Sequence, residues 1–208
     1  QDTGFFDDIS LHLTNTHRGI DFLRKQGIEA KILSEYIDEQ FLLHGILVKS
    51  QKEDIVAYNP KKGYRFTANL LRCLNKYHIR FAAIENMSRE QVIETLQKAK
   101  VYIDFGNHPG KDRLPREAAM LGCCVITGKR GSAGYYEDVP ILDKFKFKED
   151  RENIDMIVHT ILKCLKDYDS MHHYFISYKE CIKREKRTFI HQINSVFKVE
   201  KECFKHGK

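Results

Sequence analysis

The chain has 208 residues, of which 42% are hydrophobic and 11% aromatic, with 12 Gly and 4 Pro. This composition excludes disordered, collagen-like and low-complexity chains. No apolar stretch approaches the ~20 residues that cross a bilayer, and the N-terminus lacks the basic and apolar regions of a secretory signal. The length predicts one sizeable domain with an appendage. The absence of an initiator Met suggests a piece of a longer polypeptide.

Positive charge is concentrated at the C-terminal end. The net charge is +6, from 35 Lys and Arg against 29 Asp and Glu, and residues 179–208 supply most of it. The remainder is nearly neutral, which argues against a nucleic-acid-binding protein, because phosphate-backbone contacts need basic charge clustered on the binding face. We interpret the tail as a solvated basic helix face. The six cysteines contain no C-x-x-C pair, and we expect reduced core residues in a cytoplasmic protein.

The first part of the chain predicts a small unit of alternating strands and helices. Residues 11–15 predict a strand, 16–28 a helix, and 31–43 a short strand followed by a helix. The polar run VKSQKED at 48–54 follows. We place a domain boundary at this break.

Residues 54–127 alternate β-type runs with amphipathic stretches, which is typical of a parallel sheet covered by helices. Apolar residues at helical spacing then predict a helix over 151–168 and a further helical run over 172–204. The fold class is therefore α/β, a Rossmann-like open parallel sheet with helices on both faces, with a partial N-terminal unit and a long C-terminal helix. The predicted strands are 55–59, 80–84, 101–105 and 124–127. The predicted helices that connect the first three strands are 63–77 and 88–99. Ser88 and Gln91 form a capping box at the start of the second helix.

Basic, glycine-bearing loops follow three of these strands. Ligands of an open parallel sheet bind beyond the carboxyl ends of its strands, so these loops form the candidate site. The first brings Lys61 and Lys62 to a helix N-terminus, where free N–H groups favour an anion. The last, residues 128–134, could form a nest of amides for a phosphate, although neither a dinucleotide fingerprint nor a P-loop is present. Taken alone, two lysines in a loop are more typical of a solvated pair.

The loop after the third predicted strand, residues 106–117, is the most elaborate. Gly106 and Gly110 permit close backbone approach to a ligand, and Lys111 and Arg113 can neutralise phosphate oxygens. Together the three loops imply a ligand that carries a diphosphate.

A carboxylate follows in the next helix. We expect this helix to open at Pro115, which suits the first helical position, so that Glu117 lies in the first turn. Its two oxygens suit the two hydroxyls of a ribose. Alternatively, Glu117 only complements the helix dipole.

No metal site is expected. Asp167-Tyr168-Asp169 resembles a D-x-D motif but closes a helix far from the three loops, and His172-His173 lacks further ligands at metal spacing. We expect no pair of carboxylates near the loops, and we therefore predict binding without a metal or another cofactor.

The run AKVYIDFGNHPGKDRLPREAAMLGCCVITGKRGSAGYYEDVPI, with the upstream IVAYNPKKG, resembles the nucleotide-sugar-binding C-terminal half of GT-B glycosyltransferases of the bacterial polysaccharide (group 1) type. The resemblance covers residues 54–147. Residues 5–45, with TNTHRGIDFLRKQGI and LSEYIDEQF, more weakly resemble the tail of the acceptor-binding half. The resemblance as a whole implies three parts: an acceptor-side remnant over 1–47, a donor-binding domain over 48–170, and a helical extension over 171–208. This extension would cross back to the N-terminal half.

The resemblance also implies roles for individual residues. Glu117 matches the ribose-binding Glu of the family, and Lys62 matches the Lys that contacts the diphosphate. The family's upstream Glu is replaced here by Pro109, so Lys111 and Arg113 are the candidates for the donor-phosphate role. The catalytic assignment is thus Glu117, Lys111 and Arg113, and the donor-binding assignment is Asn59, Lys61, Lys62, Gly63, Asn86, Met87, Gly106, His108, Gly110, Gly131, Ser132 and Ala133.

The implied activity is sugar transfer from a nucleotide diphosphate sugar to the hydroxyl of a saccharide or lipid-linked acceptor, in surface polysaccharide synthesis. The implied partners include a missing N-terminal half or partner subunit and peripheral contact with a membrane, but no nucleic acid. Three alternatives stay open: a nucleotide-sugar-binding domain without catalysis, a nucleotide-sugar epimerase, and a module that binds nucleic acid through the basic C-terminal helix.

Overall fold

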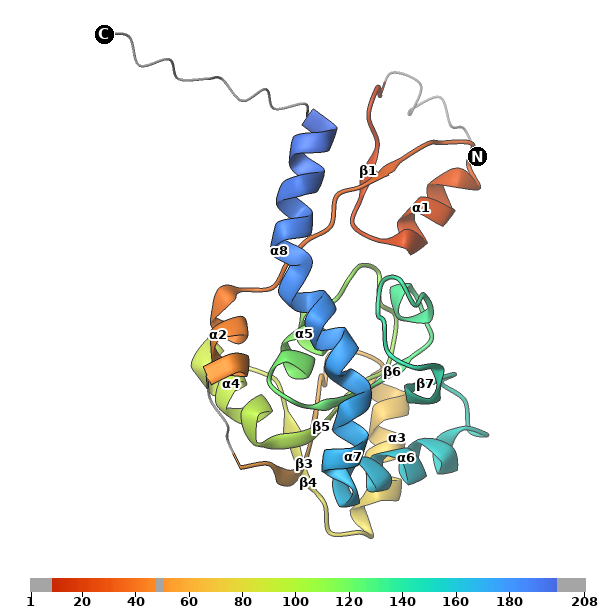
Figure 1. Cartoon of the computed structure of the whole chain (residues 1–208). Helices are drawn as coiled ribbons and strands as arrows, with labels where there is room; N and C mark the ends of the chain where they lie inside the picture. Colours follow the sequence, from red (N-terminus) through yellow and green to blue (C-terminus); the bar gives the residue numbers. More distant parts are fainter. Residues whose placement is uncertain (1–8, 48–50, 198–208) are drawn as a thin grey trace, which may run out of the picture.

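The computed structural model describes residues 9–47 and 51–197. It contains a small N-terminal unit, a larger domain on a five-stranded sheet, and a long helix that joins them (Figure 1). Residues 48–50 of the predicted polar break and 198–204 of the last predicted helix lie outside the described residues. Within the described ranges, every helix is too short or too polar to span a bilayer.

The N-terminal unit is a two-stranded parallel sheet with one helix. β1 (Leu13–Thr14) pairs with β2 (Lys31–Ile32), and α1 (His17–Arg24) connects them. The side chain of Thr16 caps α1 by accepting the N–H of Gly19. α2 (Glu39–Leu47) then packs against the larger domain. The predicted order of strand, helix, strand and helix is confirmed.

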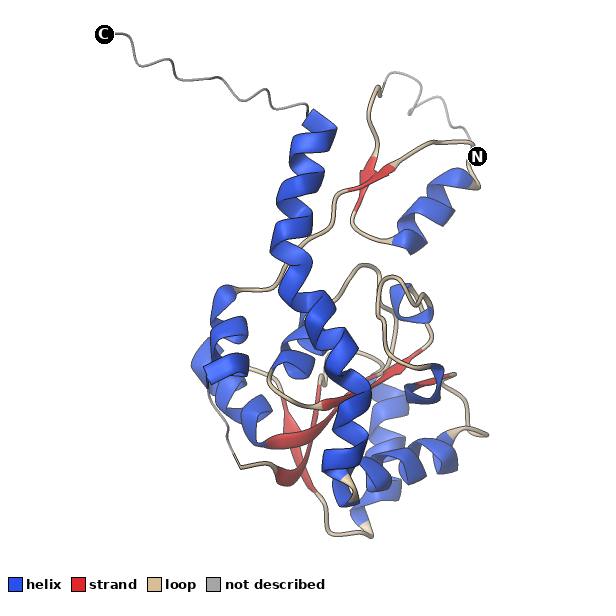
Figure 2. Cartoon of the chain, in the orientation of Figure 1, coloured by secondary structure: helices blue, strands red, loops and turns tan. Residues whose placement is uncertain are grey.

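The larger domain is built on five parallel strands in the order β4-β3-β5-β6-β7. Figure 2 draws the strands in red and the helices in blue. These are β3 (Glu53–Tyr58), β4 (Arg80–Ala83), β5 (Ala99–Asp104), β6 (Cys124–Gly128) and β7 (Lys146–Phe147). The four predicted strands are confirmed with small shifts at their ends, and β7 is an addition. Because β3 lies between β4 and β5, the strand order reverses there, which is the point where open sheets bind ligands.

Helices cover both faces of this sheet, as predicted. They are α3 (Tyr64–Asn75), α4 (Arg89–Lys98), α5 (Arg113–Met120), α6 (Ile154–Lys166), α7 (Tyr168–His172) and α8 (Ile176–Phe197). α3 contacts α6, whereas α2, α4, α5 and α8 form a second group of contacts. The capping box of Ser88 and Gln91 opens α4 as expected.

The start of α5 differs from the expectation that Pro115 opens the helix. α5 begins at Arg113, so Pro115 is its third residue and Glu117 its fifth, and the expectation that Glu117 lies in the first turn is wrong. The position tolerates proline because the first N–H groups of a helix have no intrahelical acceptor to lose.

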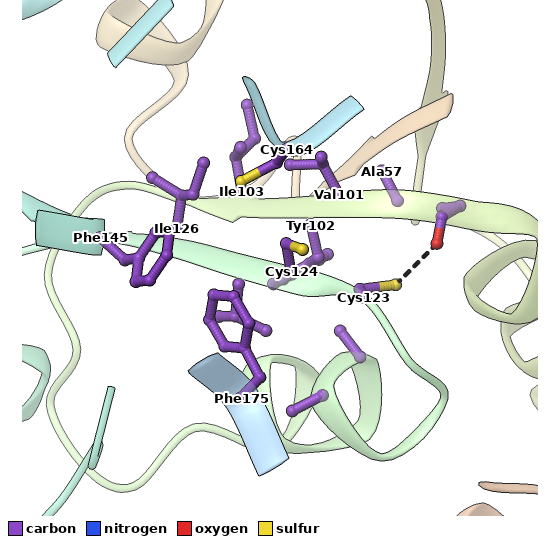
Figure 3. Close-up of a cluster of buried hydrophobic side chains, with 14 of the residues drawn as sticks. Ala57, Val101, Tyr102, Ile103, Cys123, Cys124, Ile126, Phe145, Cys164 and Phe175 are labelled. Atoms are coloured by element: carbon purple, nitrogen blue, oxygen red, sulfur yellow. Dashed lines mark hydrogen bonds between the residues drawn. The ribbon is translucent and has the colours of Figure 1, made fainter. Parts of the chain in front are cut away.

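The core is centred on β5 and β6, whose side chains are buried on both faces (Figure 3). Cys123, Cys124 and Cys164 belong to this core, and the Cys123 thiol donates to the carbonyl of Leu96 at 3.2 Å. The expectation that the cysteines are core residues is wrong for Cys73 and Cys181, which lie on solvent-facing positions of α3 and α8. All five are free, and Cys203 lies outside the described residues.

α8 crosses back to the N-terminal unit, as expected (Figure 1). Ser34 donates its N–H and its hydroxyl to the side-chain oxygen of Gln192, at 2.8 and 2.7 Å. The rings of Tyr36 and Phe189 lie 5.2 Å apart. These contacts fix the end of α8 to the segment that follows β2.

Candidate functional site

The loops after β3, β5 and β6 meet at the carboxyl edge of the sheet. Gly63 and Gly106 have positive φ and touch, since a Cβ on Gly106 would lie 2.6 Å from the Gly63 nitrogen. Gly131 approaches His108 even more closely, because its Cβ would lie 2.1 Å from the His108 carbonyl oxygen. The predicted convergence of the loops is confirmed. These glycines permit contact between loops, whereas the sequence suggested room for a ligand.

The first loop directs its two lysines differently. The Asn59 side chain accepts the N–H of Lys61, which forms a tight turn. Lys61 is exposed, with Nζ 4.0 Å from Glu85. Lys62 is mostly buried and forms an ion pair with Asp112 of the β5–α5 loop. Only Lys62 therefore points into the space shared by the loops.

A chain of buried polar side chains leads from β5 to this ion pair. The Tyr102 hydroxyl donates to Asp104 Oδ2 at 2.9 Å, and Asp104 Oδ1 lies 3.9 Å from His108 Nε2. His108 Nδ1 is 2.5 Å from Asp112 Oδ2. Asp104 and His108 are each 1% exposed. Two carboxylates thus flank one imidazole at the end of the central strand.

The two carboxyl groups have opposite pKa shifts. Burial raises the pKa of Asp104 to about 6, although His108 and Lys62 partly offset it. Burial also acts on Asp112, but hydrogen bonds from His108 and Lys62 outweigh it and lower the pKa of Asp112. Asp112 is therefore the ionised partner of Lys62 at neutral pH.

Asp104, His108 and Asp112 also have the spacing of metal ligands, because one ligand atom of each lies within 4.8 Å of the others. The expectation that no pair of carboxylates lies near the loops is wrong. The ammonium of Lys62 already contacts Asp112 here, so a cation would have to displace it. This arrangement was not predicted from the sequence, because residues 104, 108 and 112 lie in a strand, a loop and a helix cap and share no single periodic element.

The N-terminus of α5 lies beside this cluster. Asp112 is its N-cap residue, yet the Asp112 side chain accepts no helix N–H. Arg113 is exposed at the first helical position, and Glu117, one turn further, is 6% exposed. Burial raises the pKa of Glu117, and Arg113 and Arg116 partly offset the rise. Among the described residues, no hydrogen bond or ion pair involves the Glu117 carboxylate.

Lys111 pairs with a different carboxylate from Lys62. Its Nζ lies 2.8 Å from Glu185 of α8. It lines a cavity of about 190 Å³ that also contains Asn15 and Ser34 of the N-terminal unit and Gln192 of α8. The structure thus separates Lys111 from Lys62, and its expected contact with a donor phosphate stays a prediction.

Arg116 is a residue that the sequence analysis missed. It is fully buried, and its guanidinium lies 2.7 Å from Glu35 and 2.9 Å from Glu185. It also donates to the carbonyls of Lys111 and Asp112, at 2.7 and 3.1 Å. Arg116 therefore fixes the β5–α5 loop to α8 and to the segment before α2. No sequence signal pointed to it, since both carboxylates are distant along the chain.

Two of the remaining predicted residues donate their backbone N–H groups to other parts of the protein. The N–H of Ser132 donates to the His108 carbonyl at 2.8 Å, and the N–H of Gly106 donates to Glu149 Oε1 at 2.8 Å. Gly131 and Ala133 flank Ser132 in the β6 loop. Gly110 lies against the Asn15 side chain. Asn86, with φ of 54°, and Met87 form the loop between β4 and α4.

The N-terminal unit docks on the same edge. The buried Asp138 carboxylate accepts the N–H groups of His17 and Arg18, at 2.7 and 3.1 Å, and so caps α1 from a distant part of the chain. Arg18 also donates to the carbonyl of Pro109 at 3.2 Å. The candidate site therefore lies where the two units meet.

No protein-family profile and no curated protein matches this sequence. Among solved structures, the chain is similar to HepE (Alr3699) of Anabaena in complex with UDP-glucose, with a TM-score of 0.65 and 13% identity over 91% of this chain and 64% of HepE. It is also similar to TarM, with a TM-score of 0.65 and 16% identity over 89% of this chain and 43% of TarM. TarM of S. aureus was also solved with Fondaparinux, alpha-GlcNAc-glycerol and UDP.

These likenesses define the fold. HepE and TarM are GT-B glycosyltransferases, and this chain has the α/β fold of that class, as the sequence predicted. The chain spans less than two thirds of the length of HepE, at 64%.

Proposed function

We propose that this chain provides the donor-binding part of a glycosyltransferase, which transfers a sugar from a nucleotide diphosphate sugar to an acceptor hydroxyl in surface polysaccharide synthesis. The observation that carries this proposal is the N-terminus of α5. Within the described residues, its first N–H groups are not capped by Asp112, Lys62 lies across from it, and the buried carboxylate of Glu117, one turn further in, forms no hydrogen bond or ion pair. A diphosphate suits the first two features and a ribose suits the third.

The proposed donor lies along the carboxyl edge of the sheet. Glu117 accepts the ribose hydroxyls, Lys62 and Arg113 neutralise the diphosphate, and the β4–α4 loop with Asn86 and Met87 borders the base. The loop of Gly131, Ser132 and Ala133 borders the sugar end. The UDP-glucose in the HepE structure, which has this fold, supports a ligand of this class.

Catalysis in this proposal consists of stabilising the leaving diphosphate. Charge develops on its oxygen as the bond to the sugar breaks, and fixed positive groups stabilise that charge. Lys62, Arg113 and the uncapped amides of α5 supply these groups, so the chain needs no metal for this step. Lys111 is a further candidate for contact with the diphosphate, but it would first have to leave Glu185, its partner in this structure.

The acceptor side is formed by the N-terminal unit and by what accompanies it in the complete enzyme. Asp138 and Pro109 hold α1 against the donor loops, so an acceptor would approach from that side. A saccharide or lipid-linked acceptor, a cytoplasmic location and peripheral membrane contact belong to this proposal.

Nucleotide binding to Glu117→Ala and Lys62→Ala tests the proposal. After UDP, ADP, GDP and CDP are compared, the tightest binder is titrated as nucleoside, monophosphate and diphosphate. Charge-assisted hydrogen bonds contribute about 1.5 to 3 kcal/mol each, so Glu117→Ala should weaken all three forms by about ten- to a hundredfold. Lys62→Ala should weaken the diphosphate far more than the nucleoside, and less so at high salt.

Glu94→Ala and Lys98→Ala are the matched controls, since both residues are exposed on α4. Neither should change any affinity. If Glu117→Ala also leaves all three affinities unchanged, Glu117 only complements the helix dipole and the site assignment fails.

A donor-binding domain without catalysis is the second candidate. The coverage of 64% of HepE favours it, because a catalytic partner could lie outside this chain. Slow hydrolysis of a bound nucleotide sugar by the chain alone would favour the enzyme, and binding without any turnover would favour the second candidate.

A further inference from the structure

The ion pair between Lys62 and Asp112 joins two loops of the proposed donor site. Lys62 belongs to the β3–α3 loop, and Asp112 caps α5. Their side chains are 24% and 20% exposed, so a ligand can reach both. The lysine that suits a diphosphate is therefore already neutralised by a carboxylate of the protein.

Asp112 does not act as a normal helix cap. Aspartate at an N-cap usually accepts a backbone N–H of the first turn, but here the side chain makes no cap hydrogen bond. It is turned toward Lys62 and His108. The first N–H groups of α5, those of Arg113 and Leu114, are thus not taken by Asp112, and the carboxylate stays on the lysine.

Asp112 keeps a second partner when Lys62 leaves. His108 Nδ1 lies 2.5 Å from Asp112 Oδ2. The His108 backbone is held on both sides by the β6 loop, since its N–H donates to Arg130 at 3.3 Å and its carbonyl accepts from Ser132 at 2.8 Å. If Lys62 moved to a phosphate, the partly buried Asp112 carboxylate would therefore keep His108 as a partner.

We propose that Asp112 is an internal competitor of the nucleotide diphosphate for Lys62. This inference rests on the proposed function. As the donor binds, the Lys62 ammonium moves from Asp112 to the diphosphate, and Asp112 remains with His108. After sugar transfer, the carboxylate recaptures Lys62 and the nucleoside diphosphate leaves more readily. Asp112 thus limits how tightly the product is held.

The test is a double-mutant cycle on binding of the nucleoside diphosphate chosen above, with its dissociation rate measured by stopped flow. Removing the carboxylate frees Lys62 from its competitor, so Asp112→Asn should bind the diphosphate about three- to tenfold more tightly and release it more slowly. The gain should fall below about twofold in the Lys62→Ala background, and it should be absent for the nucleoside.

Asp54→Asn is the matched control. Asp54 pairs with Lys100 at 2.6 Å. Both residues lie near the amino ends of their strands, β3 and β5, whereas the site lies at the carboxyl ends. This variant changes the net charge equally and should leave the affinity unchanged. Asp112→Glu keeps a carboxylate and should stay within about twofold of the native chain.

Asp112→Gly serves if Asp112→Asn does not fold, because glycine is tolerated at an N-cap. Unchanged or weaker diphosphate binding by both variants would overturn the inference, since Asp112 would then only position Lys62. An equal gain for the nucleoside or in Asp54→Asn would overturn it too. If the native chain binds no nucleotide, the proposed function fails first, which is a distinct result.

Discussion

Replacement of Asp104 by Asn should stabilise the chain at neutral pH. Asp104 is 1% exposed, its Oδ1 has no hydrogen-bond partner within the described residues, and burial raises its pKa from the ordinary 3.8 to about 6. This difference of about 2 pH units corresponds to a cost of about 3 kcal/mol for ionising the buried carboxyl. Asn removes the charge, while its carbonyl can still accept the Tyr102 hydroxyl.

The pH dependence has a definite sign. The pKa of Asp104 is higher in the folded state, so the folded chain binds more protons than the unfolded chain between about pH 4 and pH 6. The stability contributed by Asp104 is therefore largest below this window and falls as pH rises through it. Relative to the native chain, Asp104→Asn should become more stable by about 1 kcal/mol between pH 5 and pH 7.5.

Urea unfolding of both chains at pH 5, 6, 6.5 and 7.5 measures this difference directly. Titrating groups that do not interact with Asp104 contribute equally to both chains and cancel. Asp54→Asn, an equal change of charge on an exposed carboxylate, is the control variant. A flat difference for Asp104→Asn, or a native chain that is the more stable at pH 7.5, would refute the reasoning.

Two further predictions follow from the charged groups of the site. A chelator should leave the affinity for the nucleoside diphosphate unchanged, because Lys62 supplies the cation at Asp112. If the chelator lowers this affinity and Mg²⁺ or Mn²⁺ restores it, then Asp104, His108 and Asp112 bind a metal. Arg116→Met should cost about 3 to 5 kcal/mol of unfolding free energy, because the buried Glu185 keeps only the Lys111 ammonium, and Glu35 and two loop carbonyls lose the guanidinium. Arg89→Met, which breaks an exposed pair with Asp38, should cost under about 1 kcal/mol. Similar costs for the two arginine variants would contradict this account.

The sheet was predictable because its signals are local. Each strand of residues 55–59, 80–84, 101–105 and 124–127 is an apolar run of strand length, and the stretches between them have helical periodicity. Because such strands are parallel, the loops that follow them lie at one edge. β7 was missed because two residues carry no periodic pattern.

The internal contacts of the site were not predictable in the same way. Arg116 binds Glu35 and Glu185, which are 81 and 69 residues away, and Glu149 reaches the Gly106 amide across 43 residues. Composition and spacing do not encode such pairs. Asp104 had a weak signal, as an acidic residue that ends a buried strand, but its neighbours in space depend on how the loop folds back.

The same long-range pairing changes how the basic loops should be understood. Six basic residues suggested a strongly positive crevice, yet most of them face a carboxylate: Lys61 faces Glu85, Lys62 Asp112, Lys111 Glu185, Lys129 Asp143 and Arg130 Glu149. Within residues 9–47 and 51–197, Arg113 alone of the six lacks a carboxylate within 4.0 Å. Binding of a diphosphate is then an exchange of ion pairs, so its free energy is the difference between two sets of contacts. Because each exchanged cation was already neutralised, fewer counterions are released than six free cations would release, and the affinity should fall less steeply with salt.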